Sequence, residues 1–378
     1  MAEEKKCEYG QGVAARLARP NILELQPYRC ARDDYSQGIL LDANENAIGP
    51  TSVPTNSLEP YDNHLNLERY PDPYQLALKE KFAAFRGFGL TPANIFVGVG
   101  SDEAIDLLMR IFCVPSMDNI LITPPTYGMY KVCAKVNDIE VISCPLSPDF
   151  ELNVPDTLQT VDRRTKLLFI CSPGNPTARA IPLKEIERIA VSSQYEGLVV
   201  VDEAYVDFSE SGSAISLINS YPNVVVLQTL SKAFGLAGIR CGFAIGAPDV
   251  IQLMNNVKAP YNINSMTTEV AINALNSVET LRKNVSTLLC QRTIVAEKLK
   301  TLSFVLEVFP SDANFILFRV SSNAKKVYTM MADSGVVIRY RGTELHCSEC
   351  LRVTIGTEEE NNSFINLLAQ IWEIINRG

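Results

Sequence analysis

Short apolar runs of strand length alternate with amphipathic helical stretches through the middle of this 378-residue sequence. The runs are apolar almost throughout, as in strands that are buried on both faces of a sheet. They cover residues 94–97, 119–122, 141–142, 166–171, 198–201, 223–227 and 241–245. Between them, residues 102–112 and 183–191 repeat apolar side chains at helical spacing. This alternation predicts an α/β fold with a mostly parallel sheet flanked by helices.

The pattern changes after about Pro260, which indicates a second domain. Long helical patterns cover residues 267–302, a few strand-like pieces follow, and a last amphipathic helix begins at Glu358. An α+β layer fits this order of elements. The start of the chain holds four prolines and little regular patterning, so we expect it to cross the molecule and join the C-terminal domain. The predicted division is an N-terminal arm over 1–55, a large domain over 56–262 and a small domain over 263–378.

Composition excludes several other classes of protein. With 34 basic and 43 acidic residues the net charge is −9, which argues against binding to nucleic acid. No apolar run approaches the roughly 20 residues of a membrane helix. The ten cysteines are scattered and the chain starts without an apolar signal core, so we expect reduced thiols in the cytoplasm. The pair Cys347 and Cys350 after His346 lacks further zinc ligands, and we interpret it as ordinary thiols, with no metal site.

Polar segments follow four neighbouring strands of the predicted sheet. They are TPPTYG with Tyr127, SPGNPT with Asn175, DEAY with Asp202 and Tyr205, and QTLSKAFGLAGIR with Ser231, Lys232 and Arg240. In open parallel sheets, ligands bind beyond the carboxyl ends of the strands. We therefore expect these four strand ends to form one ligand site.

Each of these side chains suits a different part of a ligand. Asp202 follows three valines, where a buried carboxylate needs a cation or a donor, although it could instead cap the next helix. A desolvated Lys232 would have a lowered pKa and could form an imine, although most loop lysines lie on the surface. Tyr205 could donate to an oxygen of a ring, Tyr127 could stack on that ring, and Arg240 suits a phosphate.

A glycine-containing segment provides a second anion site. Residues 98–103, GVGSDE, follow a strand and open a helix, so the backbone amides and the helix dipole could hold an anion. Glu103 stands where the dinucleotide fingerprint has its third glycine, which leaves a smaller phosphate as the candidate. A flat protonated ring with a hydroxyl, a phosphate and an aldehyde for Lys232 describes pyridoxal 5′-phosphate.

Several long segments carry a resemblance to a known family. They are Pro27-Tyr28, LDANEN from Leu41, Arg69-Tyr-Pro71, GSDEAI, PPTYGMY, SPGNPT, VVDEAY, TLSKAFGLAGIRCGF and LRVTIGT. On these segments the chain resembles the fold-type I pyridoxal-phosphate aminotransferases and, within them, the histidinol-phosphate aminotransferase family. The resemblance implies a homodimer with shared active sites. The chain departs from the family pattern at Ala178, where glycine is common, and residues 340–350 show no feature that indicates a role.

The resemblance also implies a role for each matching residue. Lys232 would hold the cofactor covalently, Asp202 would pair with its pyridine nitrogen, and Tyr205 with Asn175 would bind the ring hydroxyl. Tyr127 would stack on the ring. The cofactor phosphate would lie between Ser231, Arg240, the backbone at Ser101 and Asp102, and Tyr70 from the partner subunit. The substrate pocket would include Tyr28, Asn44, Arg339 and Arg352.

The implied reaction is a transamination in histidine biosynthesis. L-histidinol phosphate and 2-oxoglutarate would give imidazole acetol phosphate and glutamate, with Lys232 moving the proton. Two alternatives keep the same cofactor, namely an aromatic amino acid aminotransferase and a decarboxylase of phosphorylated amino acids. A regulatory protein that binds pyridoxal phosphate without turnover is an alternative from another class, although the intact Lys232, Asp202 and Tyr205 favour an enzyme.

Overall fold

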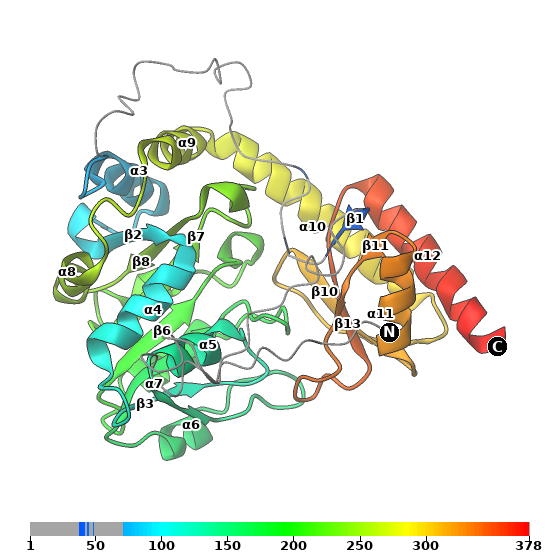
Figure 1. Ribbon diagram of the computed structural model, residues 1–378, viewed down its shortest axis with the longest axis horizontal. Helices are drawn as coiled ribbons and strands as arrows, with labels where there is room; N and C mark the ends of the chain where they lie inside the picture. The colour runs from blue at the N-terminus through cyan, green and yellow to red at the C-terminus, as the bar shows by residue number, and fades with distance from the viewer. Residues whose placement is uncertain (1–37, 42–43, 45–47, 49–70, 378) are drawn as a thin grey trace, which may run out of the picture.

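The computed structural model describes residues 38–41, 44, 48 and 71–377, and its centre is a seven-stranded sheet (Figure 1). The strands lie in the order β2-β8-β7-β6-β5-β3-β4. Their bounds are β2 Ile95–Val99, β3 Asn119–Ile122, β4 Glu140–Ser143, β5 Thr165–Cys171, β6 Leu198–Asp202, β7 Val224–Thr229 and β8 Cys241–Ile245. Neighbours run parallel except at β8, which is antiparallel to β2 and β7. The predicted mostly parallel sheet is confirmed.

Helices cover both faces of this sheet. Side chains of β5 alternate between two apolar layers, with Leu167 and Phe169 in one and Leu168 and Ile170 in the other. The first layer contains α4 (Gly100–Phe112), α5 (Met129–Val136) and α8 (Pro248–Val257), and the second contains α3 (Leu76–Arg86), α6 (Val154–Thr160) and α7 (Leu183–Ala190). Burial on both faces explains why the strands read as continuous apolar runs.

A smaller antiparallel sheet forms the second half of the molecule. Its strands lie in the order β12-β13-β10-β9, with bounds β9 Val305–Val308, β10 Phe315–Val320, β12 Arg339–Tyr340 and β13 Cys350–Thr354. The helices α10 (Val278–Lys300), α11 (Ala324–Asp333) and α12 (Glu358–Arg377) pack around it. The short strand β1 (Ile39–Leu40) pairs in parallel with β11 (Val336–Val337). The described part of the N-terminal arm therefore contacts the small domain.

The expected helical stretch over residues 267–302 is two helices that meet at Ser277. The first, α9 (Ser265–Asn276), packs against α3, where the hydroxyl of Thr268 donates to Oε1 of Gln75 at 2.6 Å. The second, α10, runs from there to the small sheet (Figure 1). The domain boundary after residue 262 stays a prediction.

Short 3-10 helices form several of the connections. They are η3 (Pro92–Asn94), η4 (Val206–Phe208), η5 (Ala214–Leu217) and η6 (Ala237–Ile239). None of the helices in the described part of the chain combines the length and the apolar character that crossing a bilayer requires.

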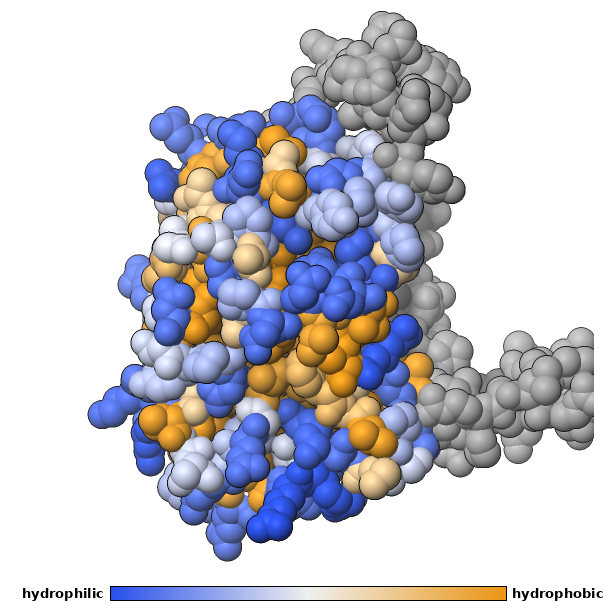
Figure 2. All heavy atoms as spheres, turned by 90° about the vertical axis from the view of Figure 1, so that its left-hand side faces the viewer, coloured by the Kyte–Doolittle hydropathy of each residue, from blue (hydrophilic) through white to orange (hydrophobic). Residues whose placement is uncertain are grey.

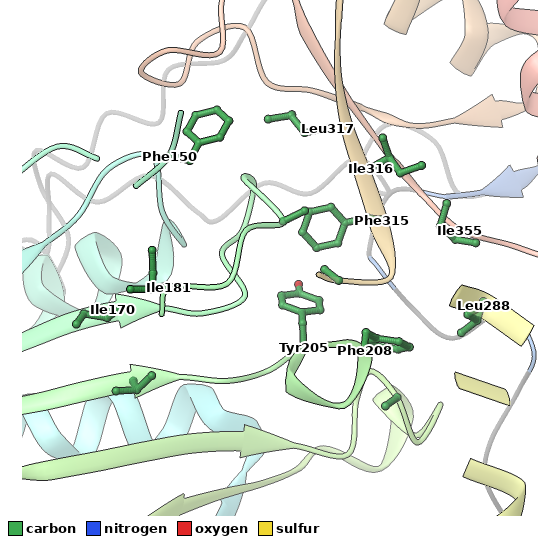
Figure 3. Close-up of a cluster of buried hydrophobic side chains, with 14 of the residues drawn as sticks. Phe150, Ile170, Ile181, Tyr205, Phe208, Leu288, Phe315, Ile316, Leu317 and Ile355 are labelled. Atoms are coloured by element: carbon green, nitrogen blue, oxygen red, sulfur yellow. The ribbon is translucent and has the colours of Figure 1, made fainter. Parts of the chain in front are cut away.

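Aromatic side chains join the large sheet to the small one. Tyr205, in the loop after β6, faces Phe315 at the start of β10, with ring centroids 5.2 Å apart (Figure 3). Phe150 and Phe309 make a second contact of this kind at 5.1 Å. The packed rings hold the small sheet over the carboxyl ends of the parallel strands, where ligands bind in such folds.

Candidate active site

A cavity of about 260 Å³ lies at the carboxyl ends of β5, β6 and β7. Its lining includes Asn44, Ser101, Asp102, Tyr127, Asn175, Asp202, Tyr205, Ser231, Lys232, Arg240, Arg339 and Arg352. These are all the predicted site residues that the structure describes. Tyr28 and Tyr70 lie outside the described residues. Polar side chains from eight separate places in the sequence are thus brought together.

Asp202 is the last residue of β6 and is buried at the floor of the cavity. The hydroxyl of Tyr130 donates to its Oδ2 at 2.7 Å, and the backbone N–H of Ala204 donates to its Oδ1 at 3.2 Å. Burial raises the pKa of Asp202 to about 6, although both hydrogen bonds and the charge of Lys232 act in the opposite direction. A buried carboxylate of this kind is well suited to a cationic partner.

Lys232 and Tyr205 place an amine and a phenol in the same cavity. The half-buried Lys232 follows β7, and its Nζ lies 5.8 Å from the centroid of the Tyr205 ring. Nδ2 of Asn44 donates to the Tyr205 hydroxyl at 3.0 Å. Burial raises the pKa of Tyr205 to about 12, so the phenol keeps its proton at neutral pH and can donate a hydrogen bond.

One end of the cavity is built to hold an anion. Helix α4 begins at Gly100, which has φ of 70°. A Cβ at Gly100 would lie 2.6 Å from Nη2 of Arg240, and one at Gly242 would lie 2.3 Å from the backbone nitrogen of Ser101. The two glycines therefore let the N-terminus of α4 approach the guanidinium. Nη1 of Arg240 also lies 3.5 Å from Oγ of Ser231, which adds a hydroxyl to this cradle.

Asp102 and Tyr127 complete that end. Nη2 of Arg240 donates to Oδ2 of Asp102 at 3.3 Å, and the hydroxyl of Tyr127 donates to Oδ1 at 3.1 Å. The carboxylate thereby holds the guanidinium and the aromatic ring on either side of the cradle.

Arginines of the small sheet form the other end of the cavity. Arg339 on β12 lies directly opposite Arg352 on β13. Nη1 of the buried Arg352 donates to Oδ1 of Asn175 at 2.5 Å, and its guanidinium carbon lies 5.0 Å from the centre of the Phe315 ring. The cavity thus has a cationic group at each end, with Lys232 and Asp202 between them.

Three residues at or beside the cavity were not predicted from the sequence. Tyr130 is fully buried and holds Asp202, and its signal was the three-residue spacing from Tyr127 at the start of a helix. Thr229 donates to Oγ of Ser231 at 2.9 Å. Arg341 lines the cavity from within the segment 340–350, where its two-residue spacing from Arg339 was the available signal.

Ala178 adopts the backbone conformation for which the family commonly uses glycine. Its φ is 60°, in the region that strains a residue with a Cβ. Its N–H donates to the carbonyl of Gly174 at 2.8 Å, and its carbonyl accepts from the N–H of Asp312 at 2.7 Å. The SPGNPT loop is therefore held from both sides, and Asn175 lines the cavity.

The cysteine pair lies outside the cavity. Cys347 and Cys350 are free thiols, and both are buried in the small domain. His346 contacts the carbonyl of Leu146 at 3.2 Å through its Nε2. Among residues 38–41, 44, 48 and 71–377, no cluster of three or more His, Cys, Asp and Glu side chains could hold a metal ion.

The chain belongs to the aminotransferase class I and II family, whose model matches residues 36–368. The fold is similar to the crystal structure of the histidinol-phosphate aminotransferase from Sinorhizobium meliloti in complex with pyridoxal 5′-phosphate. The two structures superpose with a TM-score of 0.84 over 95% of this chain and 98% of that one. Because its sequence identity is 22%, this likeness concerns the fold alone, and it confirms the expected fold-type I architecture.

Relatives with higher sequence identity show which aminotransferases this chain belongs to. The histidinol-phosphate aminotransferases of Schizosaccharomyces pombe and Saccharomyces cerevisiae are 46% and 45% identical to this chain. Each match covers 93% of this chain and 95% of the relative. Within the aminotransferases, the chain therefore belongs to the histidinol-phosphate aminotransferases, as the resemblance implied.

Proposed function

We propose that this chain is a pyridoxal-phosphate-dependent transaminase of histidine biosynthesis. It converts L-histidinol phosphate and 2-oxoglutarate to imidazole acetol phosphate and glutamate, in either direction. The observation that carries the proposal is the single cavity in which the amine of Lys232 and the buried Asp202 lie between two cationic ends. Membership of the histidinol-phosphate aminotransferase family supports the choice of substrate.

The residues of the cavity fit pyridoxal phosphate. The glycine-lined N-terminus of α4, Ser231 and Arg240 suit its phosphate, and Asp202 suits a protonated ring nitrogen. Asn175 and Tyr205 supply polar groups for the ring hydroxyl. When bound, the cofactor supplies an aldehyde that takes up an amino group and a ring that accepts electrons from the substrate carbon.

The chain's own residues then have separate tasks. The Lys232 amine would hold the cofactor through its aldehyde and, as a free amine, would take a proton from the substrate carbon as a general base and return it as a general acid. The Asp202 carboxylate keeps the ring nitrogen protonated, and the Tyr130 hydroxyl fixes the direction of that carboxylate. The Tyr205 hydroxyl can donate a hydrogen bond, because its pKa of about 12 keeps the phenol protonated at neutral pH. Tyr127 forms the wall beside the ring.

The two substrates require one end of the site to accept unlike anions. A guanidinium can bind either a phosphate or a carboxylate through two parallel hydrogen bonds. Arg339 and Arg352 lie opposite each other at that end, and Arg352 is oriented by Asn175 and Phe315. The pair is therefore suited to bind the substrate anion in both half-reactions.

Replacing Arg352 by alanine is expected to raise KM for both substrates about 10- to 100-fold, because a charged hydrogen bond is lost in each half-reaction. Steady-state kinetics with each substrate varied in turn measure the effect. The expected pattern is a parallel rise, and a change for one substrate alone would contradict the shared site. Arg282→Ala, on α10, is the control for loss of an arginine outside the cavity.

A competition assay separates the proposed activity from its alternatives. The purified enzyme is offered L-histidinol phosphate and phenylalanine together with 2-oxoglutarate, and the products are quantified. We expect imidazole acetol phosphate to form in large excess over phenylpyruvate. Preference for phenylalanine would indicate an aromatic aminotransferase, release of carbon dioxide would indicate a decarboxylase, and cofactor binding without turnover would indicate a regulatory protein.

The proposed assembly is a cytoplasmic homodimer with shared active sites, in which Tyr70 of the partner subunit reaches the cofactor phosphate. Figure 2 shows apolar residues gathered among polar ones on the side that carries α3 and α8. Leu76 on α3 and Leu253 and Val257 on α8 are exposed apolar side chains, which suits a contact with a second copy. Sedimentation equilibrium measures the mass in solution, and a monomer that turns over at full rate would exclude shared sites.

A further inference from the structure

Arg341 lies on the same face of the small sheet as Arg339 and Arg352. Its backbone N–H donates to the carbonyl of Cys350 at 2.9 Å, so the pairing of β12 with β13 continues to this residue. Residues two apart in a strand share a face, which places Arg341 beside Arg339. All three arginines line the cavity. The substrate end therefore has three guanidinium groups.

Three guanidinium groups at one end of the cavity favour an anionic ligand there. Like charges directly opposite each other on two strands are destabilising, and Arg339 is opposite Arg352. Nη1 of Arg352 donates to the neutral Asn175, and Nη1 of Arg341 forms an ion pair with Glu344 at 3.7 Å. The three charges together are suited to a group with more than one negative charge, such as a phosphate.

The arginines differ in depth, and the two substrates differ in reach. Arg352 is buried, whereas Arg341 is half-buried. In glutamate the α-carboxylate carbon is bonded directly to the reacting carbon. In L-histidinol phosphate a methylene and an ester oxygen separate the phosphorus from that carbon. A phosphate therefore extends farther from Lys232 than a carboxylate does.

We propose that Arg341 is a specificity-determining residue that binds the phosphate of the amino donor. Arg352 holds either anion, and Arg341 adds a contact that the shorter α-carboxylate does not reach. This inference rests on the proposed function and extends it to the segment 340–350, for which the sequence indicated no role. Glu344 restrains the Arg341 guanidinium until a phosphate replaces it.

Replacing Arg341 by glutamine tests the proposal in the holoenzyme. KM for L-histidinol phosphate should rise about 10- to 100-fold, as expected for loss of a hydrogen bond to a charged group, while KM for glutamate changes less than about threefold. Arg341→Lys keeps the charge but loses the planar guanidinium, so its KM for L-histidinol phosphate should lie between those of the wild type and Arg341→Gln. Arg188→Gln is the matched control, because Arg188 pairs with Glu185 at the same i, i+3 spacing outside the cavity. Equal changes for both substrates, or none, would overturn the proposal.

A second readout does not depend on turnover. Inorganic phosphate should raise Tm of the wild-type holoenzyme, in which the cofactor already fills the other anion site, and should raise Tm of Arg341→Gln less. Equal stabilisation of the two proteins would overturn the proposal. If Arg341→Gln weakens phosphate binding but the wild-type enzyme does not transaminate L-histidinol phosphate, the anion site stands and the proposed function is wrong.

Discussion

Replacing Lys232 by alanine is expected to lower kcat for transamination at least about 1,000-fold. The Nζ of Lys232 enters the cavity over the ring of Tyr205, and the charge of Lys232 is close enough to oppose the rise in the pKa of Asp202. Alanine leaves no group to bond to the cofactor aldehyde or to transfer the substrate proton. Coupled assays with L-histidinol phosphate and 2-oxoglutarate measure the loss.

The control for this variant is Lys184→Ala, since Lys184 is exposed on α7 outside the cavity. Its kcat should equal that of the wild-type enzyme. Reduction of the wild-type holoenzyme with borohydride, followed by peptide mass spectrometry, should place the cofactor mass on the peptide that contains Lys232. Lys232→Ala with more than a tenth of the wild-type kcat, or a label on another lysine, would contradict the assignment.

Replacing Asp202 by asparagine is expected to slow the half-reaction about 100- to 1,000-fold while the cofactor stays bound. Asparagine cannot hold the ring nitrogen in its protonated form, so the ring withdraws fewer electrons from the substrate carbon. The cofactor is expected to stay bound because Asp202→Asn leaves its phosphate site unchanged. That site consists of Ser231, Arg240 and the N-terminus of α4. Stopped-flow spectroscopy measures the rate, and phosphate analysis measures cofactor stoichiometry. Near-normal turnover would exclude this role for Asp202.

The same substitution should stabilise the cofactor-free protein at neutral pH. Burial raises the pKa of Asp202 from 3.8 to about 6, so the folded state favours the protonated acid. The stability from that proton is present below about pH 4 and is lost as the pH rises through 6. At pH 7 this pKa difference lowers the free energy of unfolding of the wild-type protein by roughly 3 kcal/mol. Asparagine carries no charge, so the variant does not lose this stability.

Urea unfolding of the cofactor-free proteins measures this effect. Asp202→Asn should have the larger free energy of unfolding at pH 7, and the gap to wild type should narrow toward pH 4. Burial also raises the pKa of Glu203, to about 7, so the stability of each protein depends on pH for a second reason. Glu203 is present in both proteins, so the test uses the difference between their free energies of unfolding. A gap that stays constant with pH would contradict the raised pKa of the buried Asp202 carboxylate.

The fold was largely predictable because strands that are buried on both faces carry continuous apolar runs. Each of the seven predicted runs corresponds to one strand, and residues 119–122 and 241–245 match β3 and β8 without a shift. The direction of β8 was not predicted, since an antiparallel strand within such a sheet is as apolar as its neighbours. The break at Ser277 was missed because the helical pattern continues through it.

The site was predictable where chemistry follows directly after a strand. Asp202, Lys232 and Asn175 all stand at such positions, and sheet geometry brings the strand ends together. Tyr130 was missed because its hydrogen bond to Asp202 depends on how α5 docks against β6, 72 residues away. Arg341 was missed because its role follows from the register of two strands in the other domain.

The most direct test of the account is the visible absorption spectrum of the purified holoenzyme, recorded before and after L-histidinol phosphate is added without any oxo acid. One half-reaction then runs once and stops, so cofactor chemistry and amine specificity are read together. We predict that the band of the lysine-bound cofactor disappears as its amine form appears, and that phenylalanine has little effect. A band that L-histidinol phosphate leaves unchanged, while another amine removes it, would contradict the proposed function.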